Sequence, residues 1–326
     1  MYRWFRHGCR KYFLVLGALA CRLKILLGGY PRSFDGTTNR KSPALTFTKE
    51  IMKQILFAAL AVACTTALAQ PATTITVSPA DMKGWVFFDD GTTNGPCLPA
   101  SVCAMVVGPA TPPAGNGSAR LKLVTSGERP TLGALLGQLA GKKFADLTAL
   151  SYSTYKTTPT TAGDVLAIAL QFNVDNDVAD GDFAFKGRLV FEPYHEPSLG
   201  PVLAGVWQTW NTLNGKWWLS SAGNPARFPS LVCAQAAPCT WAQLLGYYPN
   251  IGVRDVPGQP NTVLKAGGGW TNFDGNTDAL TVGIDGTTTI YNFELGPTNK
   301  DECKNGGWEG IYKNQGQCVS SFSKSN

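Results

Sequence analysis

Residues 280–295 read LTVGIDGTTTIYNFEL. On both sides of the Asp285-Gly286 dipeptide, apolar residues stand at every second position, which is the period of a strand with one buried face. An Asp-Gly pair between two such runs favours a tight hairpin turn, because both residues tolerate positive φ. The stretch therefore predicts two antiparallel strands packed on a core.

The same alternation recurs through the chain from residue 75 onward. In residues 166–174 and 188–194, apolar side chains alternate with polar ones, as expected of half-buried strands. One short helix is predicted at 240–247, with Thr240 as its N-cap. Many short strands separated by Gly and Pro turns predict an all-β, two-sheet antiparallel sandwich of the jelly-roll or lectin-like type. Further strands are expected near 74–78, 85–88, 102–107, 119–125, 148–155 and 203–210.

An export signal lies inside the amino-terminal region rather than at its start. Residues 52–69 hold a positive charge at Lys53, an apolar run, and the small-x-small sequence Ala67-Leu68-Ala69. We interpret them as a signal peptide cleaved after Ala69, so that the protein is secreted or periplasmic. Residues 1–51 are interpreted as an upstream extension that results from a misassigned start, with translation beginning at Met52.

The charge of the chain depends on this processing. Of 28 Lys and Arg residues, 11 precede Gln70, and of 22 Asp and Glu residues, 2 do, which leaves 17 against 20 and a net charge of about −3. The basic balance thus belongs to the removed part, and we expect no nucleic-acid partner. No stretch after Ala69 is long enough to span a bilayer, so no membrane partner is expected after processing.

Six cysteines follow Gln70, an even number that predicts disulfides in an exported chain. Their spacing favours three local pairs, with the first two pinning surface loops: Cys97–Cys103, Cys233–Cys239 and Cys303–Cys318. The domain organisation is then a sandwich at 70–298 and a disulfide-closed tail at 299–326.

Two resemblances accompany these patterns. The segments RLVFEPY (188–194), GVWQTW (205–210) and FDGNTDALTVGIDGTTTIYNFEL (273–295) resemble a family of exported, largely uncharacterised bacterial proteins, which implies a lectin-like sandwich but no firm activity. The sequence CKNGGWEGIYKNQGQCV (303–319) resembles a cysteine-closed tail that recurs at the ends of exported bacterial proteins.

Enzymatic motifs are few. No nucleophile elbow, phosphate loop or dinucleotide fingerprint is present. Glu192 and Glu294 are candidates for the paired carboxylates of a glycosidase, and His195 is the one histidine after the signal. Lys265-Ala266-Gly267 resembles a strand of alginate lyases with this type of fold, although the Arg and Gln-x-His strands that accompany it there are missing.

A calcium site is a further hypothesis. Asp274, Asn276 and Asp278 offer oxygen ligands at alternate positions, as calcium loops do. The alternative is that Asp and Asn are present because they favour turns.

The binding hypothesis rests on the polar sides of three consecutive strands, which we expect to pair as a meander. Their shared surface would hold a stacking ring, amides and one charge of each sign, which suits a neutral or mildly acidic glycan. The residues expected on it are Gln171, Asn173, Arg188, Glu192, Tyr194 and either Trp207 or Trp210.

The sequence thus favours an exported protein that binds a glycan or other cell-surface ligand without catalysis. A polysaccharide-degrading hydrolase or lyase is the alternative, and a structural or adhesive surface protein is the third. Apart from calcium, no cofactor is expected.

Overall fold

The structure is a computed structural model that describes residues 71–91, 95–157, 165–297, 299–309 and 311–322. The chain divides between Ala67 and Leu68, and all described residues belong to the second unit. This division lies close to the predicted cleavage point after Ala69. The predicted signal peptide and the extension before it lie outside the described residues.

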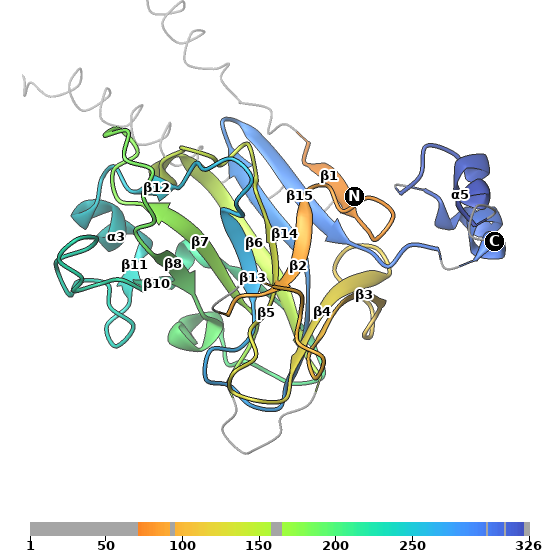
Figure 1. Cartoon of the computed structure of the whole chain (residues 1–326), viewed down its shortest axis with the longest axis horizontal. Coiled ribbons are helices and arrows are strands. Elements are labelled where there is room, and N and C mark those ends of the chain that lie inside the picture. Colours follow the sequence, from red (N-terminus) through yellow and green to blue (C-terminus); the bar gives the residue numbers. More distant parts are fainter. Residues whose placement is uncertain (1–70, 92–94, 158–164, 298, 310, 323–326) are drawn as a thin grey trace, which may run out of the picture. The chain divides into compact units, whose positions relative to one another are not determined.

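Two β-sheets form the body of this unit (Figure 1), so the predicted all-β sandwich is confirmed. The first sheet runs in the order β1-β15-β14-β4-β3, with β6 paired to β14 and β9 paired to β6. Its strands are β1 (Thr73–Val77), β3 (Val102–Val107), β4 (Gly117–Leu123), β6 (Leu147–Lys156), β9 (Trp207–Asn211), β14 (Phe273–Ile284) and β15 (Thr287–Phe293).

The second sheet runs in the order β11-β10-β8-β7-β13-β5-β2, with β12 paired to β7. Its strands are β2 (Trp85–Asp89), β5 (Pro130–Ala134), β7 (Ala169–Asp175), β8 (Arg188–Phe191), β10 (Lys216–Leu219), β11 (Cys239–Thr240), β12 (Gly252–Val253) and β13 (Thr262–Lys265). The pairing is antiparallel except between β1 and β15, which run parallel.

The hairpin predicted at 280–295 is present. β14 and β15 pair antiparallel, and Asp285 and Gly286 both have positive φ, as a tight hairpin turn requires. The predicted helix is α3 (Trp241–Tyr247), and Thr240 forms a capping box with Gln243. Both elements were specified by local sequence alone.

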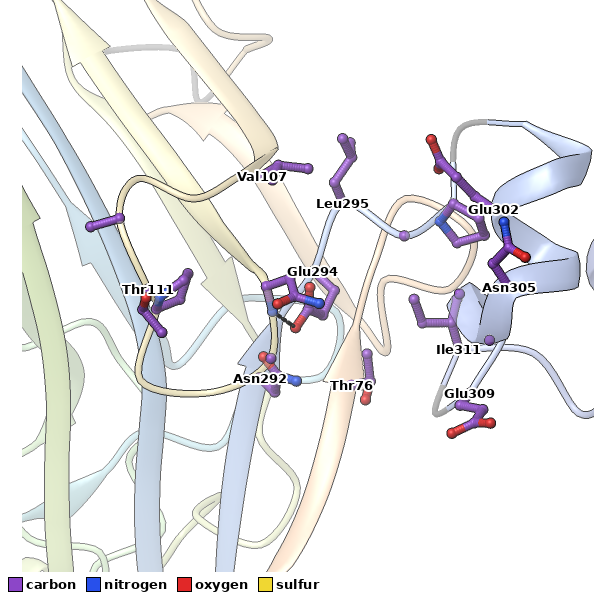
Figure 2. Close-up of a pocket in the computed structure, with 18 residues that line it drawn as sticks. Thr76, Val107, Thr111, Asn292, Glu294, Leu295, Glu302, Asn305, Glu309 and Ile311 are labelled. Atoms are coloured by element: carbon purple, nitrogen blue, oxygen red, sulfur yellow. Dashed lines mark hydrogen bonds between the residues drawn. The ribbon is translucent and has the colours of Figure 1, made fainter.

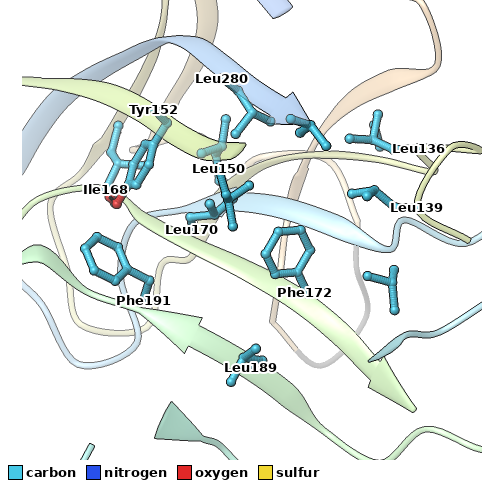
Figure 3. Close-up of a cluster of buried hydrophobic side chains, with 14 of the residues drawn as sticks. Leu136, Leu139, Leu150, Tyr152, Ile168, Leu170, Phe172, Leu189, Phe191 and Leu280 are labelled. Carbon is cyan, nitrogen blue, oxygen red and sulfur yellow. Dashed lines mark hydrogen bonds between the residues drawn. The ribbon is translucent and has the colours of Figure 1, made fainter. Parts of the chain in front are cut away.

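The core lies between the sheets, where apolar side chains from the inner faces interdigitate (Figure 3). Leu150 and Leu280 come from the first sheet, and Leu170 and Phe172 come from the second. Tyr152 is also buried there, and its hydroxyl donates a hydrogen bond to the carbonyl oxygen of Ile168 at 2.8 Å. Because each inner-facing residue is followed by an outer-facing one, this core fixes which side chains of β7 and β8 face outward.

The three predicted disulfides are present. Their location differs in one respect from the prediction: Cys233 and Cys239 belong to the hydrophobic core rather than to a surface loop. Trp217 and Trp241 pack nearby at 5.4 Å between ring centroids, so this corner is a compact apolar cluster. Three disulfides fit a protein of an oxidising, extracellular environment. Among the described residues, no helix has the length and apolarity to cross a membrane.

Short 3₁₀ segments at Pro193–His195 and Pro197–Leu199 end β8, and the chain then crosses to the other sheet. There β9 pairs with β6, from Ser151↔Asn211 to Tyr155↔Trp207. The expected meander of three consecutive strands is therefore wrong. The strand that pairs with β8 is β10.

Candidate functional site

A groove of about 410 Å³ lies on the outer face of the second sheet. Its floor is formed by alternate residues of three neighbouring strands: Gln171 of β7, Arg188 and Val190 of β8, and Lys265 of β13. We call this site the groove. Its remaining lining residues are Asp90, Phe185, Glu192, Tyr194, Trp218, Ser220, Gln235, Gly267, Gly268 and Trp270.

The outward alternation predicted for β7 and β8 is confirmed. Leu170 and Phe172 are buried in the core, while Gln171 between them lines the groove. Glu192 and Tyr194 line it as well, just beyond the end of β8. Asn173 stands beside the groove, where its side-chain oxygen accepts a hydrogen bond from Arg188 Nε at 3.0 Å.

The tryptophans expected on this surface lie elsewhere. Trp210 is 1% exposed and donates a hydrogen bond to Thr154 Oγ1. Trp207 packs on Tyr155 and donates to the carbonyl oxygen of Pro109. Both belong to β9 in the other sheet, so neither joins Gln171. Trp218 of β10 takes their place in the groove.

One end of the groove is an ion-pair cluster around Asp90. Arg188 makes two hydrogen bonds to its carboxylate, at 2.6 and 2.8 Å, and Lys265 Nζ lies 2.6 Å from Oδ2. Arg188 Nη1 also donates to Gln171 Oε1 at 3.1 Å. We call Arg188 and Lys265 the cation pair. Their side chains and that of Asp90 are only 11–15% exposed, so the carboxylate and both cations depend on one another.

The pKa shifts follow from this arrangement. Burial opposes ionisation of Asp90, but the hydrogen bond and charge of Arg188, together with Lys265, outweigh burial and lower the pKa of its carboxyl. Burial lowers the pKa of Lys265, and Asp90 opposes that shift. The lowered pKa of Asp90 favours its charged form, whereas the lowered pKa of Lys265 favours its neutral form. The short contacts of one carboxylate with two cations support the ionised form.

The other end of the groove is organised by Glu192. Its buried carboxylate accepts a hydrogen bond from Trp218 Nε1 at 2.9 Å and one from Gln235 Nε2 at 3.4 Å. His195 Nε2 lies 3.4 Å from the same oxygen, and its ring packs on Tyr194 at 4.3 Å between centroids. Burial, with Glu192 close by, raises the pKa of Tyr194, so this phenol remains protonated and serves as a hydrogen-bond donor.

A second cavity, of about 910 Å³, lies between the first sheet and the tail (Figure 2). Glu294 lines it from the sandwich, and Glu302 and Glu309 line it from the tail. Among the described residues, no Lys, Arg or His belongs to the lining. Glu294 accepts a hydrogen bond from the Asn116 amide at 3.0 Å, so this carboxylate holds the loop before β4. We call this cavity the acidic cavity.

Glu192 and Glu294 directly follow strands of different sheets, β8 and β15, and line different cavities. They therefore do not form the carboxylate pair that a glycosidase needs. His195 lies beside Glu192 and not near Glu294.

The residues expected to bind calcium lie within β14, not in a loop. Each has a partner: Asp274 pairs with Arg120, Asn276 donates to Ser118 Oγ, and Asp278 accepts from two backbone amides. Over the described ranges, no group of three or more His, Cys, Asp or Glu side chains is placed to hold a metal ion. Calcium binding remains a prediction, and the protein partners of these side chains argue against it.

Sequence reasoning missed several groove residues. Asp90 gives no local signal, because its partners Arg188 and Lys265 lie 98 and 175 positions away. The outward position of Trp218 could have been predicted, because adjacent tryptophans in one strand face opposite sides of the sheet. Trp217 fills the core, which leaves Trp218 facing outward.

Comparisons with known proteins add no assignment: no protein-family model, curated protein or solved structure matches this chain.

Proposed function

We propose that this protein is exported through residues 52–69 and binds a carbohydrate in the groove. One observation supports this proposal above the others. An open groove combines the half-buried ring of Trp218 with the amides of Gln171 and Gln235 and with charges of both signs. Aromatic faces stack on the apolar faces of sugars, and paired donors and acceptors match hydroxyl groups.

Hydrogen bonds hold two of the side chains that line the groove. Trp218 is fixed by its hydrogen bond to Glu192, and Gln171 is fixed by Arg188. Such pre-organisation reduces the entropy lost when a ligand binds. Each charged group on the groove floor already has a partner, so no free nucleophile is present among them.

The test is binding of the protein to a glycan array, followed by calorimetry on the best ligand. Trp218→Ala is expected to weaken binding by at least tenfold, and Trp218→Phe, which keeps an aromatic face, by less. Gln171→Ala should also weaken binding. Trp207→Ala is a matched control, because this tryptophan lies on the other sheet. Equal losses for Trp207→Ala and Trp218→Ala would argue against the groove.

A polysaccharide lyase is the second candidate, because ionisable groups with shifted pKa values gather in one groove. Lys265, which resembles a lyase position, stands there with Arg188, Gln171 and Tyr194. A lyase is favoured over a hydrolase because Glu192 and Glu294 are not paired. Incubation with polyuronates should then produce unsaturated sugars that absorb in the ultraviolet, and a reducing-sugar assay should rise in parallel. Binding without either signal would support the non-catalytic function.

A further inference from the structure

Phe185 extends the groove onto the loop between β7 and β8. Its ring lines the groove and is 41% exposed. Two guanidinium groups lie over it: the Arg227 Cζ atom is 5.3 Å from the ring centroid, and the Arg254 Cζ atom is 5.8 Å from it. Arg227 and Arg254 come from separate loops, so the fold brings two positive charges to one exposed ring. We call these two residues the Phe185 arginines.

Within the described part of the chain, neither of these arginines forms an ion pair, since no carboxylate lies within 4.0 Å of either guanidinium. Arg254 donates to the Phe183 carbonyl oxygen and to Gln259, at 2.6 and 2.9 Å, and Arg227 donates to Ser221 Oγ at 3.3 Å. A guanidinium has five N–H donors, so these bonds use two donors of Arg254 and one of Arg227. Asp175 acts on Arg254 through longer-range attraction, without an ion pair.

The cation pair adds positive charge to the neighbouring part of the groove. Arg188 and Lys265 share the single carboxylate of Asp90, which leaves one positive charge in excess at this end of the groove, while the carboxylate of Glu192 lies at the other end. Arg129 adds to it: this residue repels Lys265, and its buried Nε has no hydrogen-bond partner among the described residues. The cation pair lines the groove and the Phe185 arginines lie over a ring of its lining, in a chain whose residues 70–326 carry about −3 overall.

We propose that the ligand of the groove is a polyanionic glycan, several sugar units long, whose acidic groups bind the cation pair and the Phe185 arginines at successive positions. This inference rests on the proposed function and specifies its ligand. Guanidinium groups bind carboxylates and sulfates with the same fork of donors. An exposed phenyl ring between two such groups offers a stacking face for the sugar that carries the acid.

Two sets of cations in one groove predict that affinity depends on the length of the ligand. We expect a two-unit oligosaccharide to bind at the cation pair alone. A longer one contacts both sets of cations and gains affinity because the second contact is intramolecular. Screening by salt should weaken the long ligand more than the short one.

Calorimetry on the full chain tests this, with oligogalacturonates of two and six units as carboxylated probes and a heparin hexasaccharide as the sulfated probe. The six-unit ligand should bind at least tenfold more tightly than the two-unit ligand. The double variant Arg227→Gln/Arg254→Gln should remove that gain and leave binding of the two-unit ligand unchanged. Arg227→Lys/Arg254→Lys, which keeps the charge, should restore part of it. Lys300→Gln/Lys313→Gln makes the same charge change on the tail and should have no effect.

The outcomes separate this inference from the proposed function. Equal binding of a neutral cellohexaose would leave carbohydrate binding intact and overturn the polyanionic ligand. An unchanged affinity of the arginine double variant for the six-unit probe would overturn the extended site alone. A single-stranded oligonucleotide that binds as tightly as the glycan would also overturn the assignment. Binding of no oligosaccharide, acidic or neutral, would overturn both proposals.

Discussion

Asp278 is buried and the side chain of Asp90 is only 11% exposed, yet their surroundings shift the pKa values of the two carboxyls in opposite directions. Asp90 in the groove contacts two cations, and its pKa is lowered. Asp278, near the acidic cavity, accepts hydrogen bonds from the backbone amides of Phe293 and Ala114, and burial raises its pKa to about 7. Glu294 adds to that rise by repulsion. The surroundings of Asp90 therefore stabilise its carboxylate, and the surroundings of Asp278 destabilise its carboxylate.

The largest expected effect is a pH dependence of stability from Asp278. Its pKa is about 7 in the folded chain, against an ordinary value of 3.8 for a solvated Asp in the unfolded chain, so the folded state binds the proton more tightly between these values. Stability from this group therefore falls as pH rises, by about 4 kcal/mol from pH 4 to pH 8. Asp278→Asn should remove this component, measured as the difference in urea unfolding between the two proteins across pH. A difference that is flat with pH would contradict the raised pKa.

Asp90→Asn should give the next largest effect, with the opposite dependence. The substitution leaves Arg188 and Lys265 together without a countercharge, and loss of one partner of such a buried pair destabilises by about 3 kcal/mol. Because the pKa of Asp90 is lowered, its contribution is present above pH 3.8 and lost as pH falls through the folded value. Chemical unfolding of the wild-type chain and of Asp90→Asn at pH 7 and pH 3 measures both the loss of stability and its dependence on pH. Asp274→Asn, at a more exposed ion pair, is the matched control and should lose less than about 1 kcal/mol.

Glu294→Gln should have the smallest effect. The pKa of Glu294 is raised by burial, and no cation among the described residues lines its cavity, so removal of the charge relieves a penalty. The amide oxygen still accepts from the Asn116 N–H, and we expect a change in unfolding free energy within about 1 kcal/mol at pH 8. If Glu294→Gln lowered the free energy of unfolding as much as Asp90→Asn does, the surroundings of Glu294 and Asp90 would not differ in how they stabilise a carboxylate.

Much of the fold could be predicted because its signals are local. The alternation in residues 166–174, the Asp285-Gly286 turn and the Thr240 cap each lie within a few residues of the element that they specify. The disulfides were predictable for the same reason, since each joins cysteines close in sequence.

The candidate site was predictable only in its β7 and β8 part. Gln171 and Arg188 share the groove because strand alternation puts them on one face, whereas Glu192 and Tyr194 line it although the predicted strand 188–194 ends at Phe191. The third strand was misplaced because the rule that consecutive strands pair does not hold where the chain leaves β8 through two proline-initiated 3₁₀ segments. Asp90 could not be found, because nothing local marks a partner 175 residues away.

The wide separation of the groove residues along the chain has a consequence for the kinetics of folding. Lys265 meets Asp90 only when strands from opposite ends of the domain have joined one sheet. Closing such long loops is slow, so contacts of this kind form late. The groove should consequently be one of the last features to appear during folding, and no partial chain or early intermediate should hold the ligand that we propose. Binding of that proposed ligand would then report that folding of the domain is complete.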